Sequence, residues 1–565
     1  MSVPRNPSSA MATVFVDELI RGGVEEMVLA PGSRSAPLAF AAHAAADAGR
    51  VRLHVRIDER SAGFLALGMA KSSRRPVPVI TTSGTAVANL HPAVLEAAHA
   101  GIPLVVLSAD RPAGLRETMA NQTTDQVKIF GDAVRTFADV PPAFAGATEE
   151  QQVPSWRSLV VRALATAAGH AAGAPGPVHL NLQLGGSLTP DADGGWTSAV
   201  DGRPEGAPWT SVPPDPEGGD VEVLRPGLRT VLVAGDDAGT AARVLAEQAN
   251  WPVLAEPTSG ARTGANGIRT YRLLLGDSSL AGQIQRVVVC GHPTLSRPVT
   301  SLLSRADLEI VAVPGATGWT DPGHQVSAVI RRPAVEAPDD PGWLDRWRER
   351  DAAVSAQLDE LLEKQDELTP HQVAARVGAA LPAAGLLYVG SSNPVRDLDL
   401  MMPRHEVGGR RLTIANRGLA GIDGTVSSAV GAALARRSTS RAFALVGDVT
   451  FLHDSNGLVI GPGEARPDLT IVVVNDDGGS IFASLEQGSP SYAASYDKLF
   501  GTPHGVDLAA LCGATGTSHR RVRSVDELET ALSTPSGGIE VLEAVVRRDN
   551  RRELDAAIRA LVPGG

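Results

Sequence analysis

A carboxylate and an amide follow two strand-like segments in the last third of the chain. Gly447 and Asp448 follow the apolar segment FALV, and Asn475 follows LTIVVV, 27 residues after Asp448. If the two segments are neighbouring parallel strands, both side chains lie at one edge of a sheet, and their oxygens are hard ligands that suit Mg²⁺. A helix that begins near Thr450 would direct its N-terminus at the same place, which favours a diphosphate. Either sequence alone is compatible with an ordinary turn, but the pair predicts a metal ion that bridges a diphosphate.

The same pair resembles the thiamine diphosphate motif, which usually begins with Gly-Asp-Gly and ends with Asn-Asn. Val449 stands where the motif has its last glycine, and Asp476 stands where it has its second asparagine. In the family the third metal ligand is the main-chain carbonyl two residues after the first asparagine, which is Asp477 here. The resemblance therefore implies thiamine diphosphate, held through Mg²⁺ or Mn²⁺ by Asp448, Asn475 and Asp477. The side chains of Asp476 and Asp477 would repel a diphosphate unless they point away from it.

Glu59 lies where a strand-like segment gives way to a helix, in the sequence IDERSAGFLALGMA (57–70). An acid in the first turn of a helix is favourable by itself, because it complements the helix dipole. Thiamine enzymes also need a carboxyl group on N1′ of the aminopyrimidine ring, where it favours the imino tautomer whose N4′ takes the proton from thiazolium C2. The resemblance therefore makes Glu59 the predicted catalytic residue.

Seven motifs together resemble the 2-succinyl-5-enolpyruvyl-6-hydroxy-3-cyclohexene-1-carboxylate synthases of menaquinone biosynthesis. General thiamine decarboxylases do not share the arginine-bearing motifs, and the resemblance covers nearly the whole chain, with 186–227 the least similar. The motifs are PGSRSAPL (31–38), DERSAGFLALG (58–68), SADRP (108–112), ANQTTDQ (120–126), NRGLAGIDG (416–424), GDVTFLHDSNGL (447–458) and NDDGGSIF (475–482). The family fold has three α/β domains, and each active site lies between subunits.

The resemblance implies two substrates, 2-oxoglutarate and isochorismate, each with two carboxylates. Only four of the 51 basic residues are lysines, so anion sites must be formed mainly by arginines, whose planar fork suits carboxylates. Matched motif by motif, the residues predicted to bind substrate are Ser33, Arg34, Arg111, Asn121, Gln122, Arg297, Arg396, Arg417 and Phe482. The residues predicted to bind the cofactor are Ser392, Gly447, Asp448, Thr450, Asn475, Asp477 and Ile481.

Two of these assignments leave alternatives open. Arg297 matches a position where the family often has a Lys–Arg pair, and this chain has one basic residue there. Each arginine taken singly also fits a surface ion pair. We assign Arg396 to 2-oxoglutarate or its decarboxylated adduct and Arg34 to isochorismate, but the opposite division is compatible with the sequence.

The implied reaction is a decarboxylation of 2-oxoglutarate, with the cofactor as electron sink, followed by conjugate addition of the succinyl-semialdehyde carbanion to isochorismate. Water must be excluded, because it would protonate the carbanion. The polar segment 488–505 either covers the site or forms an ordinary surface loop. One alternative is another thiamine enzyme, such as a 2-oxoacid decarboxylase or an acetohydroxyacid synthase, which would need fewer arginines. A second is a non-catalytic regulator of the same fold, against which the retention of Glu59, Asp448 and Asn475 argues.

These residues are distributed over a sequence that alternates apolar strands with helices, which predicts doubly wound parallel sheets. In such sheets the loops after the strand C-termini carry the function. Residues 190–219 contain 12 Pro plus Gly in 30 residues, which predicts a linker. An amphipathic helix is expected at 342–364. The predicted domains are a pyrimidine-binding domain at 1–187, a linker at 188–227, a central α/β domain without cofactor at 228–345 and a diphosphate-binding domain at 346–565.

The composition excludes several classes of protein. The 565 residues are 43% apolar and 20% charged, as in globular proteins, and the net charge of −12 argues against nucleic-acid binding. No apolar run approaches the roughly 18 residues of a membrane helix, and no signal peptide pattern is present. The two cysteines, Cys290 and Cys512, exclude a disulfide framework. We therefore expect a cytoplasmic protein that acts on small molecules, without a nucleic-acid partner or a membrane span. The family resemblance implies a homodimer or homotetramer.

Overall fold

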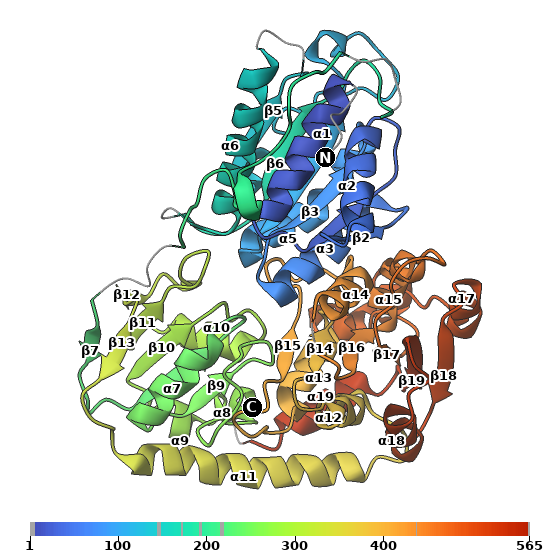
Figure 1. Ribbon diagram of the computed structural model, residues 1–565. Coiled ribbons are helices and arrows are strands. Elements are labelled where there is room, and N and C mark those ends of the chain that lie inside the picture. Colours follow the sequence, from blue (N-terminus) through green and yellow to red (C-terminus); the bar gives the residue numbers. More distant parts are fainter. Residues whose placement is uncertain are drawn as a thin grey trace. The chain divides into compact units, whose positions relative to one another are not determined.

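The structure is a computed structural model that describes residues 6–143, 148–170, 173–190, 195–214, 220–436 and 438–562. The chain, coloured from N- to C-terminus in Figure 1, divides into two compact units. Unit 1 comprises Met1–Glu217, Gly418–Arg437 and Asp454–Pro467. Unit 2 comprises Gly218–Arg417, Ser438–His453 and Asp468–Gly565.

Unit 1 contains a six-stranded parallel sheet in the order β2-β1-β3-β4-β6-β5. Its strands are β1 (Glu26–Leu29), β2 (Arg52–Val55), β3 (Val77–Thr81), β4 (Leu104–Asp110), β5 (Thr136–Val140) and β6 (Val178–Gln183). Its helices in the N-terminal part are α1 (Pro7–Arg21), α2 (Ala36–Asp47), α3 (Glu59–Ser73), α4 (Thr85–Ala88), α5 (His91–Ala100) and α6 (Glu149–Ala167). The strands β3, β4 and β6 are buried along their whole length, which is why they read as continuous apolar runs rather than alternating ones.

Helix α3 packs closely on α14 (Thr425–Ala435), which also belongs to unit 1. Two glycines allow the approach: a Cβ atom on Gly68 would lie 2.0 Å from the carbonyl oxygen of Ser428, and one on Gly431 would lie 2.1 Å from that of Leu65. The hydroxyl of Ser428 donates to the carbonyl of Phe64 over 3.1 Å. The position of α3, whose first residue is Glu59, is therefore fixed by contacts along its length.

Unit 2 contains two larger parallel sheets and a two-stranded one. The central sheet has the order β12-β11-β10-β8-β9, and the C-terminal sheet has the order β15-β14-β16-β17-β19-β18. The strands of the central sheet are β8 (Thr230–Ala234), β9 (Val253–Ala255), β10 (Arg286–Cys290), β11 (Glu309–Val313) and β12 (Val326–Val329), and β7 (Glu222–Leu224) pairs with β13 (Pro333–Val335). The strands of the C-terminal sheet are β14 (Leu386–Val389), β15 (Leu412–Ile414), β16 (Ala442–Gly447), β17 (Leu469–Asn475), β18 (Ser518–Val522) and β19 (Ile539–Val545).

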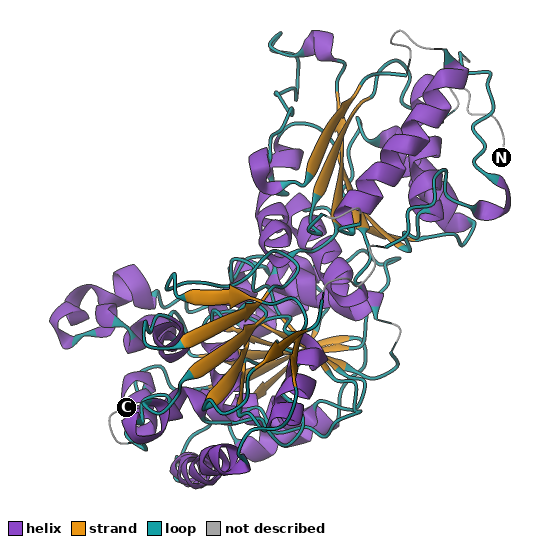
Figure 2. Cartoon of the chain, turned by 90° about the vertical axis from the view of Figure 1, so that its left-hand side faces the viewer, coloured by secondary structure: helices purple, strands orange, loops and turns teal. Residues whose placement is uncertain are grey.

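Helices lie along the strand layers of these sheets, as Figure 2 shows. The helices of unit 2 are α7 (Gly239–Ala249), α8 (Tyr271–Leu274), α9 (Ser278–Ala281), α10 (Arg297–Leu303), α11 (Pro341–Glu363), α12 (Pro370–Ala380), α13 (Asn393–Met401), α15 (Asp448–His453), α16 (Ala493–Tyr496), α17 (Leu508–Ala514), α18 (Val525–Ser533) and α19 (Arg551–Arg559). One apolar core contains side chains from both sheets, such as Val287 of β10 and Leu387 of β14. Trp343 and Trp347 of α11 belong to the same core. The shared core explains why the two sheets form one unit.

The parallel α/β architecture confirms the predicted fold class. The predicted helix at 342–364 corresponds to α11. The domain boundaries remain a prediction, and the parts of the predicted linker at 191–194 and 215–219 lie outside the described residues. Within the same stretch, Trp196 is buried in the core of unit 1 and stacks on Trp156 with ring centroids 5.5 Å apart. In the part of the chain that the structure describes, no helix is long and apolar enough to cross a membrane.

Candidate active site

The C-terminal sheet brings Asp448 and Asn475 to neighbouring strand ends, as the sequence predicts. Strands β16 and β17 are parallel partners, with Gly447 opposite Val474. Asp448 is the first residue of α15 and is 2% exposed, while Asn475 is the last residue of β17. The helix expected near Thr450 therefore begins two residues earlier, and Thr450 is buried within it.

Asp448 is held by three groups. Its Oδ1 accepts a hydrogen bond from the amide of Val449 (2.6 Å), and its Oδ2 accepts one from the amide of Gly478 (2.9 Å). Nε2 of His504 lies 3.2 Å from the same Oδ2. Nδ1 of His504 is the acceptor for the amide of Val506 (3.0 Å), so in the neutral ring the proton is on Nε2 and is donated to Asp448. No motif in the sequence marks His504 as a site residue.

Asn475 and Asp477 have side-chain partners that fix their orientation. Nδ2 of Asn475 donates to Oε1 of Glu543 (2.8 Å), and its Oδ1 accepts from the amide of Asp477 (3.0 Å). Asp477 has a left-handed backbone with φ of 57°. Its Oδ1 accepts from the amides of His504 (3.1 Å) and Gly505 (2.8 Å). The Asp477 carboxylate is thus occupied by backbone amides, which leaves its main-chain carbonyl as the predicted metal ligand.

Asp476 and Asp448 are two buried acids that affect one another. Burial, and after it the charge of the nearby Asp448 carboxylate, raise the pKa of Asp476 to about 7, in spite of a hydrogen bond with Ser480 that lowers it. Burial likewise raises the pKa of Asp448. Two carboxyl groups that repel one another favour the presence of a cation.

The donor set fits a hard divalent cation. It would consist of a carboxylate from Asp448, an amide oxygen from Asn475 and the carbonyl of Asp477, all of them oxygen ligands of the kind that Mg²⁺ prefers. Among the residues that the structure describes, no group of three or more His, Cys, Asp or Glu side chains could hold a metal ion. The amide and the carbonyl are therefore essential to the predicted site.

The other residues predicted to contact the cofactor lie on loops of the same sheet. Ser392 is the residue before α13 and has φ of 72°. Ile481 and Phe482 belong to a 3-10 turn, η5 (Ser480–Ser484), and the ring of Phe482 lies 5.7 Å from that of Phe500. The segment 488–505 therefore packs on the loop that carries the predicted apolar wall. That this segment covers the site stays a prediction.

Unit 2 also brings the half-buried Arg396 near the buried Arg417. Arg417 is 3% exposed and donates to the hydroxyl of Thr294 (2.7 Å). Arg396 donates to the carbonyl of Ser392 (2.6 Å). Burial lowers the pKa of Arg396, and the charges of Arg417 and Arg272 lower it further. Buried cations that repel one another favour the binding of an anion.

Arg297 differs from these two arginines. Its side chain is 74% exposed, and it forms an ion pair with Glu486 at 2.8 Å. An exposed ion pair of this kind contributes little to the stability of the fold. Arg297 fits its predicted role only if substrate displaces Glu486, so the prediction for this residue stays the least supported of the set.

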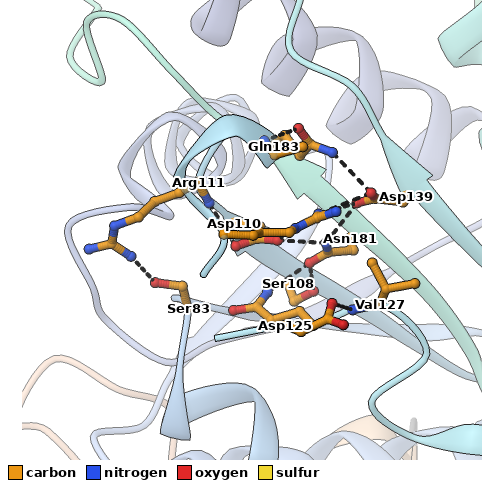
Figure 3. Close-up of polar contacts among 12 residues, drawn as sticks. Ser83, Ser108, Asp110, Arg111, Asp125, Val127, Asp139, Asn181 and Gln183 are labelled. Carbon is orange, nitrogen blue, oxygen red and sulfur yellow. Dashed lines mark hydrogen bonds and ion pairs between the residues drawn. The ribbon is translucent and has the colours of Figure 1, made fainter. Parts of the chain in front are cut away.

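Unit 1 brings a second group of predicted substrate residues together. Nη1 of Arg34 donates to the carbonyl of Leu184 (2.9 Å). Burial lowers the pKa of Arg34, and the charge of Arg111 lowers it further. Nη1 of Arg111 donates to the hydroxyl of Ser83 (2.6 Å), as Figure 3 shows, and to the carbonyl of Gln122. The two guanidinium groups are therefore close enough to repel one another.

Ser33 and Asn121 complete this group. Ser33 lies in the loop between β1 and α2, and Asn121 lies in the long loop after β4. Both are exposed. Like Arg34, they follow strand C-termini, where parallel sheets bind their ligands.

Glu59 opens α3 and is half-buried. The helix N-terminus is capped by its neighbour Asp58, whose Oδ1 accepts from the amide of Arg60 (2.8 Å). The other oxygen of Asp58 accepts from Nδ2 of Asn456 (2.8 Å). Because Asp58 serves as the cap, the helix does not require the Glu59 carboxylate for that purpose, which favours the catalytic interpretation of Glu59.

Comparisons with known proteins define the class of this protein. Residues 10–129 match the family described as "Thiamine pyrophosphate enzyme, N-terminal TPP binding domain", and residues 401–537 match its C-terminal TPP binding domain. Thiamine pyrophosphate is another name for thiamine diphosphate. The solved structure of benzoylformate decarboxylase from Polynucleobacter necessarius is similar with a TM-score of 0.63, over 95% of this chain and 99% of its own, at 18% identity. The two matched domains therefore define a thiamine diphosphate-dependent enzyme, and the fold agrees with this class.

Curated relatives narrow the class to one family. A protein from a Nocardioides species is 59% identical over 99% of this chain and 99% of its own, and one from Kineococcus radiotolerans is 48% identical over 99% and 100%. One from Saccharopolyspora erythraea is 46% identical over 99% of both chains. All three are named 2-succinyl-5-enolpyruvyl-6-hydroxy-3-cyclohexene-1-carboxylate synthase. The chain belongs to this family.

Proposed function

We propose that the protein joins 2-oxoglutarate to isochorismate with loss of carbon dioxide, giving 2-succinyl-5-enolpyruvyl-6-hydroxy-3-cyclohexene-1-carboxylate for menaquinone biosynthesis. The observation that carries this proposal is the identity of 46–59% with synthases of that name over essentially the whole chain. The protein is a transferase-type enzyme that uses thiamine diphosphate.

The C-terminal sheet would hold the diphosphate through Mg²⁺ or Mn²⁺. The side chains of Asp448 and Asn475 and the carbonyl of Asp477 would be the protein ligands. When bound, the cofactor supplies an electron sink for the decarboxylation. His504, by donating to Asp448, and Glu543, by accepting from Asn475, orient these ligands.

Glu59 would hold a proton at N1′ of the aminopyrimidine ring. Ile481 and Phe482 would form an apolar wall that keeps water away from the reacting carbon. This exclusion matters because the intended acceptor is a carbon atom of isochorismate, and a proton from water would end the reaction early.

The arginines would bind the four carboxylates of the two substrates. In unit 2 the half-buried Arg396 lies near the buried Arg417, and in unit 1 Arg34 lies near Arg111. A decarboxylase or synthase that acts on monocarboxylates would bury these charges without a ligand to balance them, which costs free energy. The paired arginines therefore favour dicarboxylate substrates over those of the alternative thiamine enzymes.

We further propose a homodimer or homotetramer in which Glu59 from one copy and Asp448 from another serve the same active site. The family resemblance supports this arrangement, and the two residues belong to different units. A cytoplasmic location fits the two free cysteines, both buried. The net charge of −12 fits small-molecule substrates rather than nucleic acid.

The direct test is to incubate the purified protein with thiamine diphosphate, Mg²⁺, 2-oxoglutarate and isochorismate and to detect the adduct by mass spectrometry. We expect an adduct that requires both substrates and the cofactor. Release of succinic semialdehyde at the same rate with and without isochorismate, and no adduct, would instead identify a 2-oxoacid decarboxylase.

A further inference from the structure

The loop at 111–127 carries three of the residues that we assign to substrate, but its conformation is not one that the chain prefers by itself. Three of its non-glycine residues have left-handed backbones, Glu117 (φ 62°), Met119 (φ 61°) and Gln122 (φ 53°). Such conformations cost free energy and persist only where the surroundings impose them. Contacts with the rest of unit 1 must therefore hold the loop.

The beginning of the loop is held by polar side chains at the ends of β4, β5 and β6, shown in Figure 3. Oδ1 of Asp110 accepts from the amide of Arg111 (2.8 Å). Oε1 of Gln183 accepts from the amide of Ala113 (2.8 Å), and Nε2 of Gln183 donates to Asp139 (3.0 Å). These contacts fix where the loop leaves the sheet, but they do not reach its far end.

The far end is held by Gln126, the last residue of the ANQTTDQ motif, which has no assigned role so far. Gln126 is 0% exposed. Its Oε1 accepts from the amide of Gly84 (2.9 Å), and its Nε2 donates to the carbonyl of Ala109 (3.3 Å) and to Oδ1 of Asn181 (2.7 Å). Both hydrogens and the oxygen of the amide are used, so the orientation of the side chain is determined.

The hydrogen bond to Gly84 leads directly to the predicted substrate residues. Gly84 has φ of 81° and follows Ser83. The hydroxyl of Ser83 accepts from Arg111 (2.6 Å) and donates to the carbonyl of Gln122 (2.9 Å). Nε2 of Gln122 donates back to the carbonyl of Ser83 (3.0 Å). Gln126 thus fixes the turn that both Arg111 and Gln122 contact.

We propose that Gln126 is a positioning residue for substrate: it locks the 83–84 turn against the end of the 111–127 loop and so aims Arg111 and Gln122 at a substrate carboxylate. The inference rests on the proposed function, because Arg111 and Gln122 need aiming only if they bind substrate. Gln126 itself is buried and does not touch substrate. Its effect should appear in the use of substrate and not in the binding of cofactor.

The test uses two variants of the full-length enzyme and a matched control. Gln126→Met keeps the volume of the side chain and removes all three hydrogen bonds, and Gln126→Asn keeps the amide but shortens its reach. The control is Gln152→Met, the same substitution at a buried glutamine of α6 in the same unit. If Gln126→Met does not fold, the same measurements are made on Gln126→Asn alone.

We expect both Gln126 variants to lower kcat/KM for at least one substrate, on the order of tenfold to a hundredfold for Gln126→Met, because small displacements of substrate-positioning groups have effects of this size. Affinity for thiamine diphosphate with Mg²⁺ should not change. Hydrogen exchange should become faster at Gly84 and in the 111–127 loop, but not in α1. Gln152→Met should behave like the unmodified enzyme in all three measurements.

A double-variant cycle with Arg111→Ala separates positioning from a general loss of stability. If Gln126 acts by aiming Arg111 and Gln122, adding Gln126→Asn to Arg111→Ala should reduce kcat/KM less than it does in the unmodified enzyme, because the two changes affect the same part of the site. Losses that simply multiply, or Gln126 variants with the kinetics of Gln152→Met, would overturn the proposal. Absence of adduct with the unmodified enzyme would instead refute the proposed function.

Discussion

Buried acids have different neighbours at the two sheets that carry the predicted active-site residues, the sheet of unit 1 and the C-terminal sheet of unit 2. Near Arg111 in unit 1, Asp110 is paired with Arg116 (3.1 Å) and accepts from Asn181 (2.9 Å). In unit 2, by contrast, Asp448 and Asp476 are neighbouring acids whose pKa values are raised. The first arrangement balances its charge within the protein, and the second is a pair of acids that a bound cation would stabilise.

The same contrast separates Arg116 of unit 1 from Arg396 of unit 2, although Arg34 in unit 1 also lies near a like charge, that of Arg111. Arg116 is satisfied by Asp110 and Asp139, whereas burial and the charges of Arg417 and Arg272 lower the pKa of Arg396. Proteins rarely bury like charges together unless a ligand balances them. The difference indicates that a cation should matter most at the C-terminal sheet of unit 2, where two neighbouring acids have raised pKa values.

The largest effect is expected for Asp448→Ala. The change removes the carboxylate that would hold the cation between protein and diphosphate, so Mg²⁺-dependent binding of thiamine diphosphate should be abolished in calorimetric titrations. Asp549→Ala, which removes an exposed acid paired with Arg547, is the control and should bind normally. Unchanged cofactor affinity in Asp448→Ala would refute the metal site and the contrast between the sheets.

Glu59→Gln should remove most turnover while leaving the unfolding temperature unchanged. An amide cannot hold and release a proton at N1′, and general acid–base assistance of this kind is worth on the order of 10²–10⁴ in rate. Deuterium exchange at thiazolium C2, followed by NMR, should slow in parallel. Exchange at the normal rate would show that another group activates the cofactor.

Arg396→Ala and Arg34→Ala should impair the use of substrate and spare the cofactor. A charge-assisted hydrogen bond contributes about 1.5–3 kcal/mol, which corresponds to roughly tenfold to over a hundredfold in kcat/KM. We expect the Arg396 variant to affect mainly 2-oxoglutarate and the Arg34 variant mainly isochorismate. Kinetics with one substrate varied at a time will decide this, and normal kinetics for both substrates in both variants would revive the monocarboxylate alternatives.

The smallest effect on activity is expected at His179, where the prediction concerns stability. The hydroxyl of Ser108 donates to Asn181 (2.8 Å), so Nε2 of His179, 2.6 Å from that hydroxyl, must be the donor to it. Burial lowers the pKa of His179 from 6.5 to about 3. Below pH 6.5 the unfolded chain therefore takes up a proton that the folded one does not bind until about pH 3, and stability falls as the pH falls through this window.

The loss from His179 should be on the order of 2 kcal/mol between pH 7 and pH 5. Replacing it by Phe keeps an aromatic ring next to Phe130 and Phe137 and removes the titrating group. Denaturant unfolding at several pH values should therefore show a shallower dependence on pH for His179→Phe. An identical dependence would show that His179 is not held neutral.

The sequence predicts the parts of the molecule that depend on local pattern. Apolar runs ending in Gly447–Asp448 and Asn475 place a carboxylate and an amide at adjacent strand ends because parallel strands fix the geometry. The sequence does not show which acid faces the metal and which faces away. That depends on the left-handed turn at Asp477 and on amides 27 and 28 residues further along, at His504 and Gly505.

Residues that act through other residues are the hardest to predict from sequence. Gln126 stands in a recognised motif, but its partners Gly84 and Asn181 are 42 and 55 residues away, and no spacing rule connects them. His504 lies in a segment whose polar composition indicates only a loop. In both cases the tertiary contacts, and not the residue types, reveal the role.

The most direct test of the proposed active site combines Glu59→Gln and Asp448→Ala in one oligomer. Two differently tagged chains, one with each change, are co-expressed, and the hybrid is purified through both tags. If each site takes Glu59 from one copy and Asp448 from another, a hybrid dimer contains one intact site and should recover about half of the normal activity, although each parent is inactive. A hybrid no more active than its parents would contradict an active site shared between two copies of the chain.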